Sequence, residues 1–491
     1  MRGCLDTVAP LLEEYMEQFA YTGLKHWFQT ISEIPRGSYH EEKIADFLVA
    51  FAKERDLFVT CDEAHNVLIR LPASSGHEKE GAILLQGHTD MVCQKREGSD
   101  HDFEKDPLSL YEEDGWLYAR DTTLGADNGV AVAVMLYILD GAEGNLPSHP
   151  MIECLFTSAE EVGLVGVKQF DFSQINARTM INLDSAEEEL LVVGCAAAAR
   201  TELTIPFSTE KARGAAYQIT VGGLMGGHSG EDIWRGRASA NTLLGRCLCR
   251  LAQEVSFRLV TLSGGTADNA IPRHATAVIV AEAAFDADAW ANNFQAELSA
   301  ELVSEDKGCF VTIKETNMPD CMMTKESNDG LCLLLGTLST GVLAWHPIIP
   351  SLVSFSRNLG IITTNADSVS LAVNTRSAED SQLDWSLCQL ELYAKALGAT
   401  IHLYNRYPGW SVAEKSPIRE KYCEAYAKIF GKKPIVKALH AGLEAGIVKQ
   451  HIPEMDVISC GPTVENLHSP DERMNMKSFE NFFRILCLVL K

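Results

Sequence analysis

The stretch AILLQGHTD (residues 82–90) is an apolar run that ends in polar residues, and MIECLFTSAEE (151–161) and TMINLDS (179–185) repeat this pattern. Each stretch predicts a buried strand with His, Asp or Glu at its carboxyl end. Continuous apolar strands are typical of a sheet that is covered on both faces, and such open sheets hold their sites beyond the carboxyl ends of parallel strands. The three stretches therefore predict an α/β fold with a mainly parallel central sheet and a polar site along one end of it.

Helical segments surround these strands in the sequence. Apolar residues recur at helical spacing over 11–30 and 40–55, and the turn-prone IPRGS (34–38) separates the two segments. DTTLGADNG (121–129) leads into an apolar stretch that indicates a buried helix. Asp127 then lies at or just before the helix N-terminus, where a carboxylate is electrostatically favoured.

The texture of the sequence changes from about residue 198. Alternating apolar and polar residues there predict strands with one solvated face in an α+β region. The alternating segments are YQITVGG (217–223), HATAVIVAEA (274–283) and DSVSLAVNTRS (367–377). A helical pattern returns at 418–430, followed by the strand-like MDVISCG (455–461) and a terminal helix. We predict an α/β domain formed by 1–197 and 410–491, with helices on both sheet faces, interrupted by an inserted α+β domain at 198–409.

Composition narrows the class of protein. A chain of 491 residues exceeds the usual size of a single hydrophobic core, so two domains are expected. Asp and Glu number 67 against 42 Lys and Arg, a formal charge of −25. This excess argues against nucleic-acid and anionic-membrane partners.

The 14 cysteines form no CxxC pair, and the opening MRGCLDTVAP lacks a basic segment followed by an apolar core. No apolar run approaches the roughly 20 residues that cross a bilayer. We therefore expect reduced thiols, a cytoplasmic location and no membrane partner.

Two pairs of polar residues at the strand ends suggest metal chemistry. His88 and Asp90 project to the same side of an extended strand, so one can bind a metal while the other fixes the imidazole. The adjacent carboxylates Glu160 and Glu161 repel each other unless cations or solvent relieve them. One can bind a metal while the other accepts a proton from metal-bound water. Each pair taken alone also fits an ordinary polar strand end or a solvated loop.

Three further residues have equally ordinary alternatives when each is taken alone. Asp127 could be a helix cap, Asp184 a turn residue and His468 an exposed loop histidine. Together with the two pairs, however, they supply imidazole and carboxylate donors from separate segments at one end of the predicted sheet. This donor set suits paired borderline cations such as zinc.

The ordered motifs GHTDMV, GADNG, SAEEVG, NLDS and NLHSPDE resemble those of the M20 family of metallopeptidases. GGHSG, ADNAIP, SRNLG and HAGLEAG bring the resemblance closer to its aminoacyl-histidine dipeptidase branch, also called peptidase D or cytosol non-specific dipeptidase. It covers essentially the whole chain. The resemblance implies two Zn²⁺ ions per subunit, with Mn²⁺ or Co²⁺ as possible substitutes.

The resemblance also implies roles for the residues at the strand ends. Asp127 would bridge the two ions, Asp90 would orient His88, and Glu160 would be the general base. One ion would be bound by His88 and Asp184, the other by Glu161 and His468.

Substrate-binding residues follow from the same resemblance. His228 in GGHSG would polarise the scissile carbonyl, and Asn269 and Arg376 would hold the substrate's backbone and terminal carboxylate, for which the planar Arg fork is apt. Gly442 would allow close backbone approach, and Glu444 would meet a free amino group. The alternative for His228 is a purely structural histidine at a strand end. The alternative for Gly442 and Glu444 is the start of a helix.

The resemblance also implies that 1–197 and 410–491 form the catalytic domain and that the inserted domain at 198–409 is a lid through which two chains dimerise. The implied activity is hydrolysis of unblocked dipeptides, with Xaa-His dipeptides such as carnosine among them. A related amidohydrolase acting on N-acyl amino acids is the alternative. A serine hydrolase using Ser229 is disfavoured because GGHSG lacks the spacing of GxSxG. A non-catalytic protein with a structural metal is disfavoured because Glu160 stands spare beside the ligands. The sequence leaves open whether His228 acts within its own chain or across a dimer.

Overall fold

The computed structural model describes residues 22–141, 146, 148–302, 304–346 and 352–491. They form two compact units. The first runs from the start of the described residues to Gly194 and includes Val412–Ala438 and Leu443–Lys491, and the second contains Cys195–Ser411 and Leu439–Gly442. The short segment Leu439–Gly442 packs with the second unit, which the sequence pattern did not indicate. The lid role of this unit stays a prediction.

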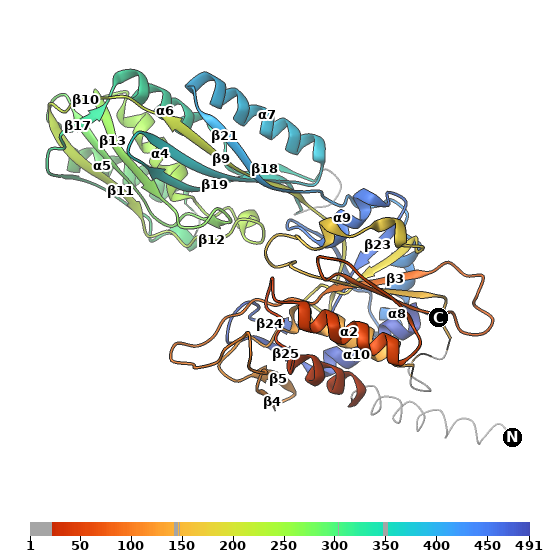
Figure 1. The fold of residues 1–491 in the computed structure, drawn as a ribbon. Coiled ribbons are helices and arrows are strands. Elements are labelled where there is room, and N and C mark those ends of the chain that lie inside the picture. The colour runs from red at the N-terminus through yellow and green to blue at the C-terminus, as the bar shows by residue number, and fades with distance from the viewer. Residues whose placement is uncertain (1–21, 142–145, 147, 303, 347–351) are drawn as a thin grey trace. The chain divides into compact units, whose positions relative to one another are not determined.

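An eight-stranded sheet forms the centre of the first unit, in the order β1-β2-β6-β3-β7-β23-β8-β22 (Figure 1). Its strands are β1 (Phe58–Cys61), β2 (Val67–Leu71), β3 (Ile83–His88), β6 (Ile152–Thr157), β7 (Thr179–Asn182), β8 (Leu190–Cys195), β22 (Ile435–Leu439) and β23 (Asp456–Ser459). The four central strands β6, β3, β7 and β23 are parallel. The flanking pairs β1–β2, β2–β6 and β23–β8 are antiparallel. β3 and β6 are buried at every position, as expected for strands covered on both faces. The predicted α/β class is confirmed.

Helices cover both faces of this sheet. They are a helix over 22–32, α2 (Glu42–Glu54), α3 (Ala126–Leu139), α8 (Pro417–Phe430), α9 (Glu444–His451) and α10 (Met476–Val489), with the short 3-10 helices η1 (Val167–Gln169) and η2 (Phe172–Gln174). α2, α3, α8 and α10 share one hydrophobic cluster with Ile83 and Leu85 of β3. The intervening Leu84 points to the opposite face and is also buried. α9 contacts β23 and η1 outside that cluster. Of the helix predicted over 11–30, residues 11–21 lie outside the described residues.

A small antiparallel sheet joins two distant parts of the first unit. Its order is β24-β25-β5-β4, with β4 (Leu110–Glu113), β5 (Trp116–Ala119), β24 (Val464–Glu465) and β25 (Arg473–Asn475). β25 pairs with β5, so the loop 466–472 is anchored against a segment that precedes it by about 350 positions. This pairing positions the late NLHSPDE motif.

The second unit is built on a nine-stranded antiparallel sheet (Figure 1). Along it run β16 (Phe310–Glu315), β11 (Ala215–Gly222), β15 (Ala275–Ala281), β13 (Phe257–Gly264), β19 (Val353–Thr364), β20 (Ser368–Ser377), β9 (Ala197–Pro206) and β21 (Thr400–Tyr407), and β18 (Gly341–Trp345) pairs with β19. Burial alternates along β9 and β15. The strands predicted at 217–223, 274–283 and 367–377 are confirmed as β11, β15 and β20.

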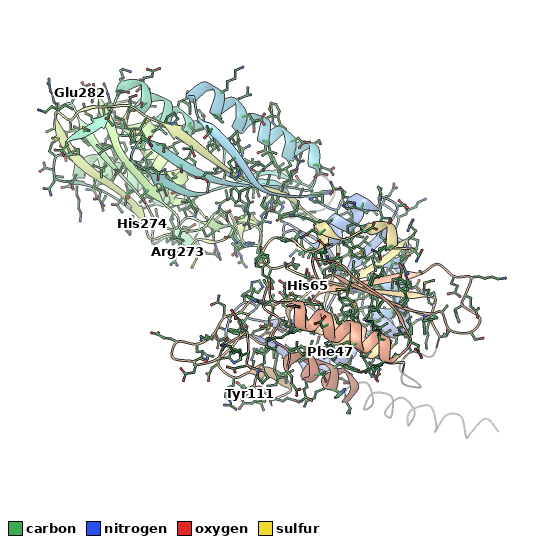
Figure 2. All side chains as sticks on the ribbon, in the orientation of Figure 1. Phe47, His65, Tyr111, Arg273, His274 and Glu282 are labelled. Atoms are coloured by element: carbon green, nitrogen blue, oxygen red, sulfur yellow. The ribbon has the colours of Figure 1, made fainter. Side chains whose placement is uncertain are left out.

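Four helices share one hydrophobic cluster with this sheet. They are α4 (Ala240–Leu251), α5 (Ala287–Glu301), α6 (Lys325–Thr337) and α7 (Asp380–Leu397). The short elements of the unit are β10 (Thr209–Lys211), β17 (Cys321–Met323), β12 (Gly227–His228), β14 (Ala270–Ile271), η3 (Ile233–Arg235) and η4 (Ser304–Asp306). Figure 2 shows His274 and Glu282 at opposite ends of β15, with Arg273 beside His274. Arg273 donates to the carbonyl of Leu224, so it supports the loop that leads to β12.

The structure also bears on disulfides and on helices that could span a membrane. None of the cysteines in the described ranges forms a disulfide. A helix with the length and apolarity needed to span a bilayer does not occur in the described part of the chain.

Candidate metal centre

The ends of three adjacent parallel strands bring the predicted ligands together. β3 lies between β6 and β7, with His88 opposite Thr157 and Gln86 opposite Asn182. The segments that follow these strands carry Asp90, the Glu160–Glu161 pair and Asp184. Because the carboxyl ends of parallel strands meet along one end of the sheet, these side chains converge there.

Two ligands come from other elements. Asp127 and Asn128 have non-helical backbone torsions at the start of α3, so Asp127 precedes the regular helix, as predicted. His468 lies in the loop between β24 and β25 and has a left-handed φ of 59°. The small sheet formed with β5 therefore delivers a histidine from the far end of the chain to the same site.

Asp127 lies between two histidines and offers one oxygen to each. Its Oδ1 is 3.1 Å from His88 Nε2, and its Oδ2 is 3.3 Å from His468 Nε2. His88 Nε2 is also 3.7 Å from Asp184 Oδ1, and His468 Nε2 is 3.1 Å from Glu161 Oε1. The five predicted ligands thus form two groups, one around each histidine, that share Asp127.

Three sets of donor atoms lie within 4.8 Å of one another: His88, Asp127 and Asp184; Asp127, Glu161 and His468; and His88, Glu160 and Glu161. Imidazole nitrogens and carboxylate oxygens are donors that suit zinc and other borderline divalent cations. Since two of the sets share Asp127, the residues present fit a pair of such ions.

Asp90 contacts both His88 and the turn that carries the glutamates. His88 Nδ1 lies 3.0 Å from the carbonyl oxygen of Asp90 and 3.4 Å from its Oδ1. The Asp90 carboxylate also accepts the backbone N–H groups of Glu160 and Glu161 at 3.0 and 3.2 Å, and the Ser38 hydroxyl at 2.8 Å. One carboxylate therefore contacts both the imidazole and the turn that carries the glutamates. The orienting role of Asp90 stays a prediction.

The electrostatics of the cluster show a surplus of buried acids. Burial raises the pKa of Glu160 well above its ordinary value and that of Asp184 to about 7. Hydrogen bonds to Asp127 and Glu161 raise the pKa of His468 to about 11. Burial alone would lower the pKa of His88, but its bonds to Asp127 and Asp90 raise it well above the ordinary value. Divalent ions bound at these donors would relieve the repulsion among the carboxylates.

His228 and Asn269 meet in the second unit through the β12–β14 pair. His228 lies opposite Ala270, and the N–H of Ser229 donates to the carbonyl of Asn269 at 2.7 Å. His228 Nδ1 accepts the N–H of Glu231 at 3.3 Å, an arrangement that leaves the proton on Nε2 in the neutral ring. Burial and the nearby Arg376 lower the pKa of His228, which also favours the neutral form.

Arg376 lies close to His228. A Cβ added to Gly230 would be 3.2 Å from both the Arg376 guanidinium carbon and His228 Cε1, so the glycine separates the two side chains. Arg376 is buried, and its Nη1 donates to the Tyr407 hydroxyl at 3.0 Å. Its Nε has no hydrogen-bond partner among the residues that the structure describes.

The last two predicted residues fall in different units. A Cβ on Gly442 would collide with the ring of Tyr407, so this position requires glycine for internal packing. Glu444 starts α9 in the first unit and is fully buried, with Oε2 accepting from Thr157 Oγ1 at 2.7 Å and from Gln86. Burial raises the pKa of Glu444 to about 8. Glu444 Oε1 has no partner within the described ranges.

Arg36, Gln86 and Glu472 are polar residues of the site that the sequence analysis did not single out. Gln86 also donates to Thr157 Oγ1 and accepts from Asn182, so it links β3 to both neighbouring strands. Glu472 belongs to the NLHSPDE motif, where the histidine alone drew attention. Arg36 lies in IPRGS, which has the composition of a turn and no further signal.

His440 gives a pH-dependent prediction for the second unit. Its Nε2 is 2.6 Å from the Ser356 hydroxyl, and burial, with a smaller effect of Arg376, lowers its pKa to about 3. Because the unfolded chain has the higher pKa, about 6.5, the folded protein binds fewer protons than the unfolded chain between these values. The unfolding free energy is therefore expected to fall by up to about 2 kcal/mol from pH 7 to pH 5 through this residue.

Denaturant titrations at the two pH values test this expectation. His440→Gln should flatten the pH dependence, whereas His402→Gln, at an exposed histidine of the same unit, should leave it unchanged. Equal pH dependence in the wild type and His440→Gln would contradict the assignment.

Comparison with known proteins identifies the family of the chain. Residues 84–491 match peptidase family M20/M25/M40. The chain is 37% identical over 469 residues to the cytosol non-specific dipeptidase of Escherichia coli (strain K12), covering 94% of this chain and 96% of that protein.

Two solved structures share the fold of this chain. The aminoacylhistidine dipeptidase from Vibrio alginolyticus superposes with a TM-score of 0.88 at 34% identity, covering 95% of this chain and 96% of that one. Aminopeptidase PepT from Bacillus cereus ATCC 10987 shares the fold, with a TM-score of 0.57 at 17% identity over 96% of this chain and 98% of that one. On the family match and the identity to the E. coli dipeptidase, the chain belongs to peptidase family M20/M25/M40.

Proposed function

We propose that this protein is a dipeptidase that uses two divalent metal ions, zinc in the first place, to hydrolyse unblocked dipeptides. One observation carries the proposal: Asp127 directs one carboxylate oxygen to His88 and the other to His468, and each histidine has a second carboxylate beside it. Such a shared carboxylate is suited to two adjacent cations.

In the proposed site His88 and Asp184 hold one ion, Glu161 and His468 hold the other, and Asp127 binds both. When bound, the ions lower the pKa of a coordinated water and polarise the scissile carbonyl. Mn²⁺ and Co²⁺ accept the same donors, so metal supply would decide between them and zinc.

Glu160 is proposed as the general base and acid. Its side chain is partly buried, at 15% exposure, and its carboxylate lies 4.0 Å from His88 Nε2. Neither of the two donor groups that share Asp127 includes it. It would take a proton from the attacking water and deliver it to the leaving amine. The pKa raised by burial supports this role, because a base with a very low pKa would not hold the proton it must pass on.

The second unit is proposed to supply substrate contacts. His228, with its proton on Nε2, would donate to the carbonyl oxygen as negative charge develops there. Arg376 would pair with the terminal carboxylate of the dipeptide, and its unpartnered Nε supports that role. The roles of Asn269, Gly442 and Glu444 in binding substrate rest on the family resemblance.

The substrate range, the location and the assembly are also proposals. The relatives are a non-specific dipeptidase of the cytosol and an aminoacylhistidine dipeptidase, which supports Xaa-His and other dipeptides as substrates and a cytoplasmic location. Homodimerisation through residues 198–409 rests on the family resemblance alone.

Elemental analysis coupled to activity on a dipeptide panel tests this function. We expect two zinc ions per chain, hydrolysis of free dipeptides that chelation abolishes and added Zn²⁺ restores, and little turnover of the N-acetylated forms, which lack the ammonium group. Faster hydrolysis of the N-acetylated forms would instead favour an N-acyl amino acid hydrolase. Full activity in a protein free of metal would contradict the proposal altogether.

A further inference from the structure

Glu472 receives an unusual number of backbone hydrogen bonds. The residue is buried, and its carboxylate accepts the N–H groups of four consecutive residues, Leu124 to Asp127, at 2.9, 3.0, 2.9 and 3.3 Å. These are the amides that open α3 and lead to the shared ligand. Glu472 also lies four residues after His468, so it ties the two loops that carry Asp127 and His468.

Arg36 holds the same loop from its carbonyl side. The residue is buried, and its guanidinium donates to the carbonyl oxygens of Gly125 at 2.6 Å and Thr89 at 2.9 Å. Thr89 lies between His88 and Asp90. Arg36 therefore bridges the end of β3 to the loop before α3, and Gly125 is held at its N–H by Glu472 and at its carbonyl by Arg36.

The glycines of GADNG make room for this arrangement. A Cβ on Gly125 would lie 2.7 Å from Arg36 Nη2, and a Cβ on Gly129 would lie 2.8 Å from the same atom. Gly125 also has a φ of 65°, which side chains disfavour. The motif that carries Asp127 thus has a glycine on each side because a guanidinium packs against both positions.

We infer that Arg36 and Glu472 are positioning residues that fix the Asp127 loop in its metal-binding conformation. The inference rests on the proposed function, because it takes Asp127 to be the shared metal ligand. Asp127 must present one oxygen toward His88 and the other toward His468, and a loop free to rotate would lose that geometry. Arg36 and Glu472 restrain this loop through hydrogen bonds to the carbonyl and the N–H of Gly125. Leaving either buried charge without these partners would cost free energy. Groups that orient metal ligands typically change metal affinity about 10- to 100-fold when they are lost.

Zinc affinity separates this role from a purely structural one. Glu472→Gln keeps the shape of the side chain but turns one oxygen into a donor that faces backbone N–H groups. We expect Zn²⁺ binding to the metal-free variant, measured by competition with a chromophoric chelator, to weaken about 10- to 100-fold. The measurement is made at a temperature at which circular dichroism shows each protein folded.

Glu153→Gln is the matched control. Glu153 is equally buried in β6 and accepts the N–H groups of Asn176 and Ala177, both at 2.9 Å, near the strand end away from the ligands. Its loss should lower the melting temperature and leave zinc affinity unchanged. Wild-type affinity in Glu472→Gln, or equal weakening in both variants, would overturn the inference. A wild-type protein that took up no zinc would overturn the proposed function and this inference together.

Arg36→Lys provides an independent arm, which decides the matter if Glu472→Gln does not fold. Lysine keeps the charge but, as a single ammonium on a flexible stem, does not reproduce the fork that reaches both Gly125 and Thr89. We expect zinc to bind at least about 10-fold more weakly. Zinc binding as tight as in the wild type would show that the fork is not needed and would overturn the role of Arg36.

Discussion

Glu160→Gln is expected to lower kcat/KM for a dipeptide by about 10²- to 10⁴-fold while leaving the zinc content at the wild-type level. The amide keeps the shape of the side chain but does not accept the proton of the attacking water. The two donor groups that share Asp127 do not include Glu160, so the ligands of both ions remain. Steady-state kinetics and elemental analysis on the same preparation measure the two quantities together.

The neighbouring residue supplies the control. Glu161 Oε1 lies 3.1 Å from His468 Nε2, so Glu161→Gln should lose zinc and regain activity as the zinc concentration is raised. Glu160→Gln should stay inactive at every zinc concentration. If the two variants behaved alike, the division of labour between the adjacent carboxylates would be wrong.

The part of the site that lies on the parallel strands follows from the sequence, because its signal is local. A continuous apolar run that ends in His, Asp or Glu predicts both the buried strand and the position of its polar end, and β3, β6 and β7 bear this out. Parallel neighbours then bring those ends together without further information. The positions of His88, Glu160, Glu161 and Asp184 are therefore accessible to this reasoning.

The position of His468 has a different origin. Nothing in its neighbourhood predicts that it lies near Asp127, since this depends on β25 pairing with β5. Only the joint set of donor residues and the ordered family motifs indicated it. The same holds for Arg36, whose partner Gly125 lies 89 positions along the chain. A side chain that acts through distant backbone carbonyls leaves no periodic pattern to detect.

HAGLEAG illustrates how a short motif can be divided by the fold. Its first residues belong to the second unit, and Glu444 opens a helix in the first. From the sequence, Gly442 was predicted to allow close approach of a substrate. In the structure, the ring of Tyr407 occupies the space next to it. Sequence identifies the need for a small residue there, and only the packing identifies its neighbour.

Asp127→Asn is expected to abolish tight binding of both zinc ions, and with it dipeptide hydrolysis. The substitution keeps the volume of the side chain, removes its charge and turns one of its two oxygens into an N–H₂ group, so at least one ion loses the shared ligand and the other loses an anionic one. The loss should exceed the roughly 10- to 100-fold weakening expected from an orienting residue such as Glu472. Isothermal titration of the metal-free protein with Zn²⁺ measures the number of sites and their affinity.

Thermal unfolding gives a second readout that does not depend on turnover. Free zinc at about 100 times its dissociation constant stabilises a folded protein by about 2.7 kcal/mol per site, so wild-type protein should melt at a higher temperature in zinc, and Asp127→Asn should not. Asp306→Asn is the matched control, because Asp306 is fully buried in the second unit and accepts the N–H groups of Met225 and Ala238 at 2.8 and 2.7 Å. That variant should be less stable overall yet keep the full response to zinc. The two variants differ in whether the lost charge lies at the site. An equal rise in melting temperature with zinc in Asp127→Asn and Asp306→Asn would therefore show that the Asp127 carboxylate does not hold the ions.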